Sequence, residues 1–209
     1  MITPFAHRFE PATDPAAPVL LVLHGTGGDE NDLLPIARML HPGAAILSPR
    51  GRVLERGMPR FFQRLAEGVF DQEDLRIRTT ELAAFVKDAT AHYGLDASRV
   101  VAVGYSNGAN IAASVLLALP TVLAGAVLLR AMVPFEPERV PDLAAKPVLI
   151  SAGRQDPLIP QPLTHRLAAI LEQAGADLTV RWYDVGHELS PPEIHEAAAW
   201  IAERQFGVR

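Results

Sequence analysis

The chain has 209 residues, of which 49% are hydrophobic and 21% are charged, a composition typical of a soluble globular domain and not of a disordered chain. Nineteen Lys and Arg against 24 Asp and Glu give a net charge of −5, which argues against a nucleic-acid-binding protein. The chain contains no Cys, so disulfides, thiolate nucleophiles and Cys-ligated zinc are excluded. Residues 1–15 lack the apolar run of a signal peptide, and we expect one cytoplasmic domain over residues 1–209.

Short apolar blocks typical of buried strands recur along the chain, with amphipathic stretches between several of them. Apolar spacing predicts helices over residues 82–93 and 163–171, and the segment 190–193 has the residues of a helix start. Wholly apolar strands that alternate with helices indicate an α/β fold, with a mostly parallel central sheet and helices on both faces. The expected strands are Val19–Leu23, Ala44–Leu47, Val100–Val103, Ala126–Leu129, Val148–Ile150 and Leu178–Trp182.

The connection from Pro49 to Asp74 shows no clear secondary-structure period. It contains five Arg and five acidic residues, so its charges cancel and we expect ion pairs within it instead of an anion-binding patch. Its apolar side chains can pack over the sheet, which is the interpretation we favour, or contact a substrate. The candidate pocket residues here are Met58, Phe61 and Phe62.

No charged residue occurs between Gly104 and Leu129, a run of 26 residues that is long enough to span a bilayer. Asn107, Asn110 and Ser114 in its first half and a Pro in its middle argue against a membrane span. The spacing of its apolar residues instead predicts a core helix, a break at the Pro and a core strand.

The pattern Gly-x-Ser-x-Gly occupies residues 104–108, between the expected strand that ends at Val103 and a helical stretch. In this position it is the pattern of a nucleophile elbow, a tight turn that holds a Ser hydroxyl above the sheet. The helix N-terminus beneath the hydroxyl would favour a developing negative charge. Such a pentapeptide also occurs by chance, but the strand before it and the helix after it favour Ser106 as a nucleophile.

A Ser hydroxyl needs a base to remove its proton, and the chain has seven His. His187 lies between the last expected strand and the last helix, at the edge of the sheet where ligand-contacting residues gather. His24 ends the first core strand, where a buried and hydrogen-bonded side chain is expected. We favour His187 as the base and expect the other five His to be solvated.

The base in turn needs a carboxylate that orients its imidazole ring. Asp156 follows the strand that ends at Ile150, so it reaches the same sheet edge as Ser106 and His187. Asp184 is the alternative, but it lies only three residues before His187 and is expected to cap or bend that connection. We favour Asp156, which gives the order Ser, Asp, His found in α/β-hydrolases.

An oxyanion hole requires two backbone N–H groups, and we assign them to Asn107, which follows the nucleophile, and to Thr26. Thr26 belongs to a Gly-rich loop over residues 24–28. This loop does not match a nucleotide-binding pattern, because Glu30 stands where a dinucleotide fingerprint needs Gly and no P-loop Lys follows.

A metal site is not expected either. His187-Glu188 begins like a zincin motif, but Pro191 stands where the second His is needed. The sequence therefore predicts acyl transfer without a metal or another cofactor.

Six segments resemble the bacterial phospholipase/carboxylesterase family, and within it the branch of hydrolases associated with hydroquinone and quinone resistance. The similarity extends from about Val19 to Ile201. The segments that carry it are Leu23–Glu30, Ser48–Gly51, Pro59–Phe62, Gly104–Gly108, Gly153–Pro157 and Gly186–Ser190.

This resemblance implies an α/β-hydrolase fold, esterase activity on small carboxylic esters, a triad of Ser106, Asp156 and His187, and commonly a homodimer. It also implies kinship to acyl-protein thioesterases, but Asn107 replaces the Gln that those enzymes usually have after the nucleophile. The segment 26–28 also replaces their usual Gly-Asp turn, so protein deacylation is less expected. The dienelactone hydrolases are further relatives with a Cys nucleophile, which this chain lacks.

Only 18 residues, 130–147, separate two of the core strands at the place where many lipases insert a lid. We therefore expect no lid domain and an open, shallow site for short acyl chains, with Met132 and Phe135 as candidate wall residues. The leading hypothesis is a serine carboxylesterase with a soluble small-molecule substrate and no membrane span. A thioesterase or lysophospholipase remains an alternative, and a noncatalytic ligand-binding protein is the alternative from another class.

Overall fold

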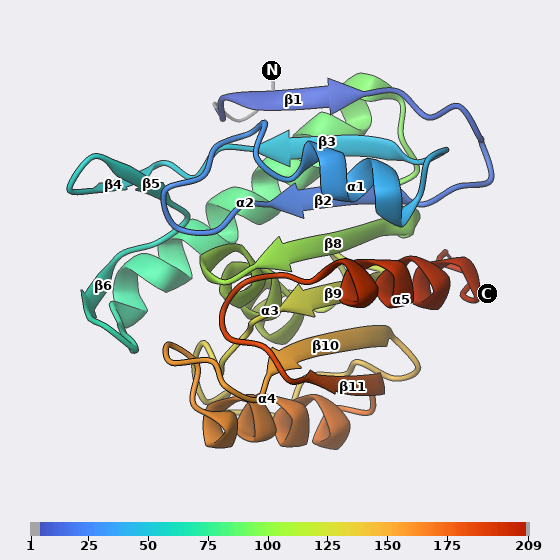
Figure 1. Cartoon of the computed structure of the whole chain (residues 1–209). Helices are drawn as coiled ribbons and strands as arrows, with labels where there is room; N and C mark the ends of the chain where they lie inside the picture. Colours follow the sequence, from blue (N-terminus) through green and yellow to red (C-terminus); the bar gives the residue numbers. More distant parts are fainter. Residues whose placement is uncertain (1–4, 208–209) are drawn as a thin grey trace.

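The computed structural model describes residues 5–207 and contains a seven-stranded central sheet (Figure 1). The strands lie in the order β1-β3-β2-β8-β9-β10-β11. All neighbouring strands pair in parallel except β1, which pairs antiparallel with β3. The strands are β1 (His7–Glu10), β2 (Val19–Leu23), β3 (Ala45–Pro49), β8 (Val100–Tyr105), β9 (Gly125–Leu129), β10 (Pro147–Gly153) and β11 (Asp177–Tyr183).

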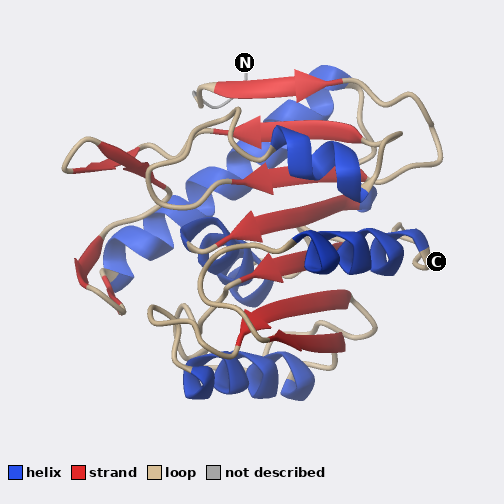
Figure 2. Cartoon of the chain, viewed as in Figure 1, coloured by secondary structure: helices blue, strands red, loops and turns tan. Residues whose placement is uncertain are grey.

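Helices cover both faces of this sheet (Figure 2). The helices are α1 (Leu34–Leu40), α2 (Gln72–Tyr93), α3 (Asn107–Ala118), α4 (Gln161–Gln173) and α5 (Pro191–Ala202), with a short 3₁₀ helix at Ala97–Arg99. The side chains of β2 alternate between the two layers: Leu21 and Leu23 pack with α2, α3 and α4, whereas Leu20 and Val22 pack with α1 and α5. Because both faces are covered, β2, β3 and β9 are buried along their whole length, which explains their continuous apolar sequences.

The six predicted core strands are present, and each predicted end lies within three residues of the observed one. The uncharged run forms α3 and β9 with a break between them, as predicted. Within residues 5–207, none of the helices combines the length and the apolar character needed to cross a membrane. Residues 130–146 form neither helix nor strand, so no lid domain is inserted between β9 and β10.

The sequence did not predict β1, which is four residues long and mostly polar because only one of its faces meets the core. Nor did it predict the two hairpins within the Pro49–Asp74 connection. One hairpin pairs β4 (Val53–Glu55) with β5 (Met58–Arg60), and the other pairs β6 (Arg64–Ala66) with β7 (Val69–Phe70). Strands of two or three residues are too short to show a period.

Four of the five Arg of this connection form ion pairs, and two of them do so with a carboxylate of the connection. Glu55 forms ion pairs with both Arg60 and Arg64 at 3.2 and 2.9 Å. Arg50 and Arg52 instead reach outside the connection, to Glu30 and to Glu81 on α2. The expected ion pairs within the connection therefore hold the second hairpin to the first, and two further ion pairs, which were not expected, hold the connection to the body of the protein.

Candidate active site

Ser106 lies in a tight turn between β8 and α3, with a φ of 53° and a ψ of −113°. A Cβ atom on Gly104 would lie 2.4 Å from the carbonyl oxygen of Gly108, and one on Gly108 would lie 2.0 Å from that of Leu23. Only Gly fits at either position, because a Cβ would overlap with main-chain atoms. The absence of these side chains lets α3 begin directly against β2 and β8, and Ser106 takes the strained backbone conformation that results.

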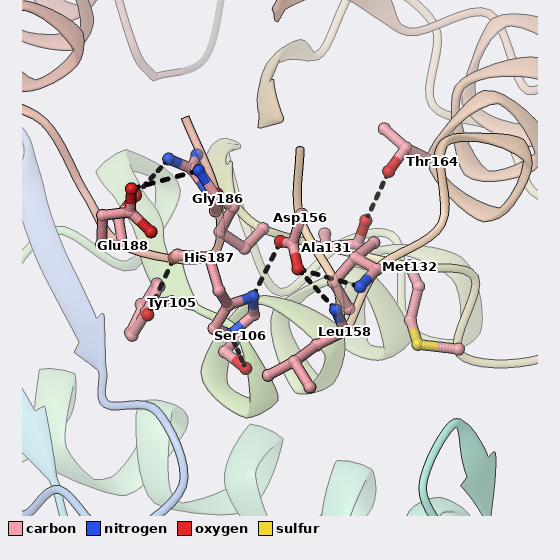
Figure 3. A network of polar contacts seen from close by, with 12 residues as sticks. Tyr105, Ser106, Ala131, Met132, Asp156, Leu158, Thr164, Gly186, His187 and Glu188 are labelled. Atoms are coloured by element: carbon pink, nitrogen blue, oxygen red, sulfur yellow. Dashed lines mark hydrogen bonds and ion pairs between the residues drawn. The ribbon is translucent and has the colours of Figure 1, made fainter. Parts of the chain in front are cut away.

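Ser106, His187 and Asp156 form a continuous chain of hydrogen bonds (Figure 3). His187 Nε2 lies 2.9 Å from Ser106 Oγ, and His187 Nδ1 lies 2.7 Å from Asp156 Oδ2. The second carboxylate oxygen of Asp156 accepts from the N–H groups of Leu158 and Ile159, at 2.8 and 3.0 Å. Since the Asp156 side chain is only 1% exposed, its orientation is fixed by these contacts.

The alternative carboxylate, Asp184, does not contact His187. Its side chain is 82% exposed and lies 3.3 Å from Arg154, with which it forms an ion pair. The ends of β8, β10 and β11 therefore bring together the three residues predicted from the sequence, and Asp184 stays at the surface.

His24, the first residue of the Gly-rich loop, is buried and hydrogen-bonded, as expected. Its Nε2 accepts from the N–H of Gly51 at 2.9 Å, so its Nδ1 donates to the carbonyl oxygen of Gly25 at 2.6 Å. Burial lowers the pKa of His24 from its ordinary value, because a charged imidazole would lose its hydration.

Thr26 and Asn107 both line the cavity beside Ser106, at the Gly-rich loop and the first position of α3. Each is fixed by the segment that ends the first hairpin. Arg60 Nη1 donates to Thr26 Oγ1 at 2.6 Å, and the N–H of Phe61 donates to Asn107 Oδ1 at 2.7 Å. The adjacent N–H of Gly27 donates to Pro59, so one short segment holds both residues on either side of Ser106.

The cavity has a volume of about 330 Å³ and opens over Ser106 and His187. Its apolar wall contains Met132, Leu158 and Ile159. The hairpins contribute the charged side chains of Arg60 and Arg64 to its wall. The buried position of Arg60 lowers the pKa of its guanidinium, an effect that Arg64 strengthens and Glu55 opposes.

Of the five candidate pocket residues, only Met132 lines this cavity. Phe61 and Phe62 point into the hydrophobic core, and Met58 is 40% exposed on β5. Phe135 lines a different cavity, next to α2 and α3. Phe61 and Phe62 are more stable in the core, so the hairpins instead present Arg60, Arg64 and Phe70 to the cavity.

Sequence reasoning missed several wall residues. Leu158 and Ile159 are apolar residues directly after Asp156, and this position could have indicated them. Nothing local distinguishes Arg60 and Arg64 from the other Arg of the connection. Within the described part of the chain, no three His, Asp or Glu side chains are grouped so that they could hold a metal ion.

Residues 6–204 match the dienelactone hydrolase family. The chain belongs to this family. It is also 50% identical over 185 residues to a protein of Bacillus subtilis (strain 168) that is named "Putative hydrolase MhqD". That similarity covers 88% of this chain and 92% of MhqD.

Solved structures of carboxylesterases are similar over almost the whole chain. The Bacillus cereus carboxylesterase is 48% identical, with a TM-score of 0.93 and coverage of 95% of this chain and 94% of that one. A carboxylesterase from Mesorhizobium loti is 31% identical, with a TM-score of 0.90 and coverage of 97% and 96%. The protein is therefore a hydrolase with the α/β-hydrolase fold, and the resemblance seen in the sequence is confirmed.

The contact between α3 and β2 predicts that Gly108→Ala destabilises the fold by about 3 kcal/mol, because the new methyl group overlaps with the main chain of Leu23. The control is Gly94→Ala, where φ is 65° but no atom lies within 4 Å of the new Cβ, and where the left-handed backbone alone is expected to cost about 1 kcal/mol. Urea denaturation measures both losses. Equal losses in the two variants would contradict the close contact.

The lowered pKa of His24 predicts a pH-dependent stability. The unfolded chain takes up a proton at His24 near the ordinary pKa of 6.5, whereas the folded protein does so only at a lower pH. The stabilisation is therefore complete well above pH 6.5 and is lost as the pH falls from there through the lowered pKa. The loss is at most about 1.4 kcal/mol per pH unit. We expect urea denaturation between pH 7 and 5 to show a weaker pH dependence in His24→Gln than in wild type. His195 is exposed, so His195→Gln is the control and should show the pH dependence of wild type. If the stability of His24→Gln depends on pH as strongly as that of wild type, His24 is not the source of this dependence.

Proposed function

We propose that this protein is a serine carboxylesterase that cleaves small, short-chain carboxylic esters through an acyl-enzyme on Ser106. The observation that carries this proposal is the chain of hydrogen bonds from Ser106 through His187 to Asp156 at the opening of the cavity. The similarity to carboxylesterases supports the same chemistry.

In the first half of the reaction, His187 Nε2 removes the proton from Ser106 Oγ as the oxygen attacks the ester carbonyl carbon. The carboxylate of Asp156 holds the Nδ1–H tautomer of His187 and stabilises the imidazolium that forms. His187 then gives the proton to the oxygen of the leaving alcohol. The C–O bond of the ester breaks, and the acyl group remains on Ser106.

The tetrahedral intermediate carries a negative charge on the former carbonyl oxygen. The backbone N–H groups of Thr26 and Asn107 are the proposed donors to this oxygen, and the N-terminus of α3 adds a favourable dipole. In the second half, His187 deprotonates a water molecule, which attacks the acyl carbon. The carboxylic acid leaves, and Ser106 recovers its proton.

The size of the cavity supports the choice of short acyl chains. The cavity has a volume of about 330 Å³, and its apolar wall contains Met132, Leu158 and Ile159, which a short acyl chain can contact along its whole length. A long acyl chain would leave many of its methylene groups in water, where they gain no binding energy. No lid between β9 and β10 extends the apolar wall.

The mechanism predicts covalent labelling by a fluorophosphonate. Ser106 Oγ should displace fluoride, and mass spectrometry of the digested protein should find the phosphonyl group on Ser106. Ser106→Ala should take up no label and should lose at least about 10⁴-fold in kcat, because the nucleophile is absent. Ser114→Ala, on the same helix but away from the cavity, is the matched control and should label like wild type.

An unlabelled wild type, or equal labelling of Ser106→Ala, would refute the mechanism. A wild type that binds small esters without turning them over would favour a noncatalytic ligand-binding protein. Faster turnover of an acyl thioester than of the oxygen ester with the same acyl group would favour the thioesterase alternative.

The cavity volume predicts that kcat/KM for p-nitrophenyl esters is highest at short acyl chains and falls as the chain lengthens. A butyrate ester should fit between Met132, Leu158 and Ile159, whereas a palmitate ester should not. The measurement is a series of initial rates from C4 to C16 below the concentrations at which the esters form micelles. An increase along this series would overturn the assignment to short chains.

A further inference from the structure

A fully buried ion pair lies directly behind the turn that carries His187. Arg130 follows the end of β9, and Glu193 belongs to the first turn of α5. Both side chains are 0% exposed. Arg130 Nη1 lies 2.7 Å from Glu193 Oε1, and Arg130 Nη2 lies 2.9 Å from Glu193 Oε2. The pair is therefore bidentate, which fixes the plane of the guanidinium.

The remaining donors of Arg130 bind main-chain carbonyl groups on either side of His187. Arg130 Nε donates to the carbonyl oxygen of Gly186 at 3.1 Å, and Nη2 donates to that of Glu188 at 2.5 Å. Its Nη1 also donates to the carbonyl oxygen of Ser151 on β10 at 3.3 Å. All five N–H groups of the guanidinium are thus directed at an acceptor.

Tyr105 binds the carbonyl group of His187, which lies between those of Gly186 and Glu188. Its hydroxyl donates to the carbonyl oxygen of His187 at 3.0 Å (Figure 3). Burial raises the pKa of Tyr105, so the hydroxyl remains a donor at neutral pH. Three successive carbonyl groups, at residues 186–188, are therefore each bound by a side chain from β8 or from the end of β9.

Glu193 connects this arrangement to the rest of the sheet edge. It accepts from Ser151 Oγ at 2.7 Å and from the N–H of Ser190 at 3.3 Å, in addition to its pair with Arg130. Arg130 itself has a φ of 60°, and its N–H donates to Ser151. A left-handed conformation is unfavourable for Arg, so the surrounding contacts must stabilise it.

The stability of the fold does not by itself require this ion pair. Desolvation of both charges offsets most of their attraction, and apolar residues of similar volume often stabilise a protein equally well. Apolar side chains, however, cannot bind the carbonyl oxygens of Gly186 and Glu188. The ion pair is therefore needed to fix the position of the turn at His187, and apolar residues could not replace it there.

We propose that Arg130, oriented by Glu193 and assisted by Tyr105, positions His187 so that its imidazole meets both Ser106 and Asp156. Arg130 touches no reacting atom, so it is a positioning residue and not a catalytic one. The inference rests on the proposed function for the effect on turnover. The hydrogen bond between His187 and Asp156 gives a second readout that does not depend on turnover.

The central variant replaces both members of the pair, Arg130→Met with Glu193→Leu, which fills the space with apolar atoms and leaves no buried charge unpaired. Tyr105→Phe removes a single hydroxyl. Thr79→Val is the matched control, because it removes a buried hydrogen bond to Ser114 that lies away from the cavity. Urea denaturation shows first whether each variant is folded.

Two readouts then report the position of His187. The first is kcat and KM for a short-chain p-nitrophenyl ester. The second is the low-field ¹H NMR resonance of the proton between His187 Nδ1 and Asp156 Oδ2, assigned with His187→Gln. Loss of stability alone would change neither readout while the protein remains folded.

We expect the double variant to fold, to lose about 100-fold in kcat with little change in KM, and to show a shifted or broadened resonance. Tyr105→Phe should lose about fivefold in kcat, since one hydrogen bond is removed. Thr79→Val should keep the kcat and the resonance of wild type even where its unfolding midpoint is lower.

A folded double variant with kcat within about twofold of wild type and an unchanged resonance would overturn the positioning role. Should the double variant not fold, an unchanged kcat and resonance in Tyr105→Phe would overturn it. The proposed function fails separately, when the fluorophosphonate does not label wild-type Ser106. In that case the resonance alone decides whether Arg130 positions His187.

Discussion

The close contact between α3 and β2 is the constraint on which the candidate site depends. With no side chain at Gly104 or Gly108, the helix begins in contact with the main chain of two strands, and the turn between strand and helix has no room for a relaxed conformation. Ser106 is therefore held at a φ of 53°, and its N–H donates to Leu129 on the neighbouring strand. The hydroxyl position is thus set by main-chain packing.

Buried arginines hold the groups on both sides of Ser106. Arg60 binds Thr26 on one side, and Arg130 binds the carbonyl groups next to His187 on the other. Each guanidinium is paired with a carboxylate, so neither is buried without an opposite charge beside it. The two arginines stabilise loops: Arg60 holds the Gly-rich loop to the first hairpin, and Arg130 holds the turn at His187 to the end of β9 and to α5.

The parts of this protein that the sequence predicts are those with a local signal. The core strands are continuous apolar blocks, and Ser106 stands in a five-residue pattern, so neither requires knowledge of distant contacts. His187 and Asp156 followed from the rule that residues after parallel strands share one edge. Arg130 also follows a parallel strand and is the first charge after the long uncharged run, but no sequence pattern marks its contact with the main chain of Gly186. The aromatic candidates of the hairpin connection failed because burial competes with exposure to a cavity.

The second hairpin also bears on how the substrate range of such a protein can change during evolution. Strands β6 and β7 pair only with each other and form no part of the central sheet, yet Arg64, Glu67, Gly68 and Phe70 all line the cavity. Substitutions or length changes in this hairpin can reshape the entrance while the register of the sheet and the contacts of Ser106 stay the same. The substrate specificity can therefore change through this hairpin without a change in the packing of the sheet that holds Ser106.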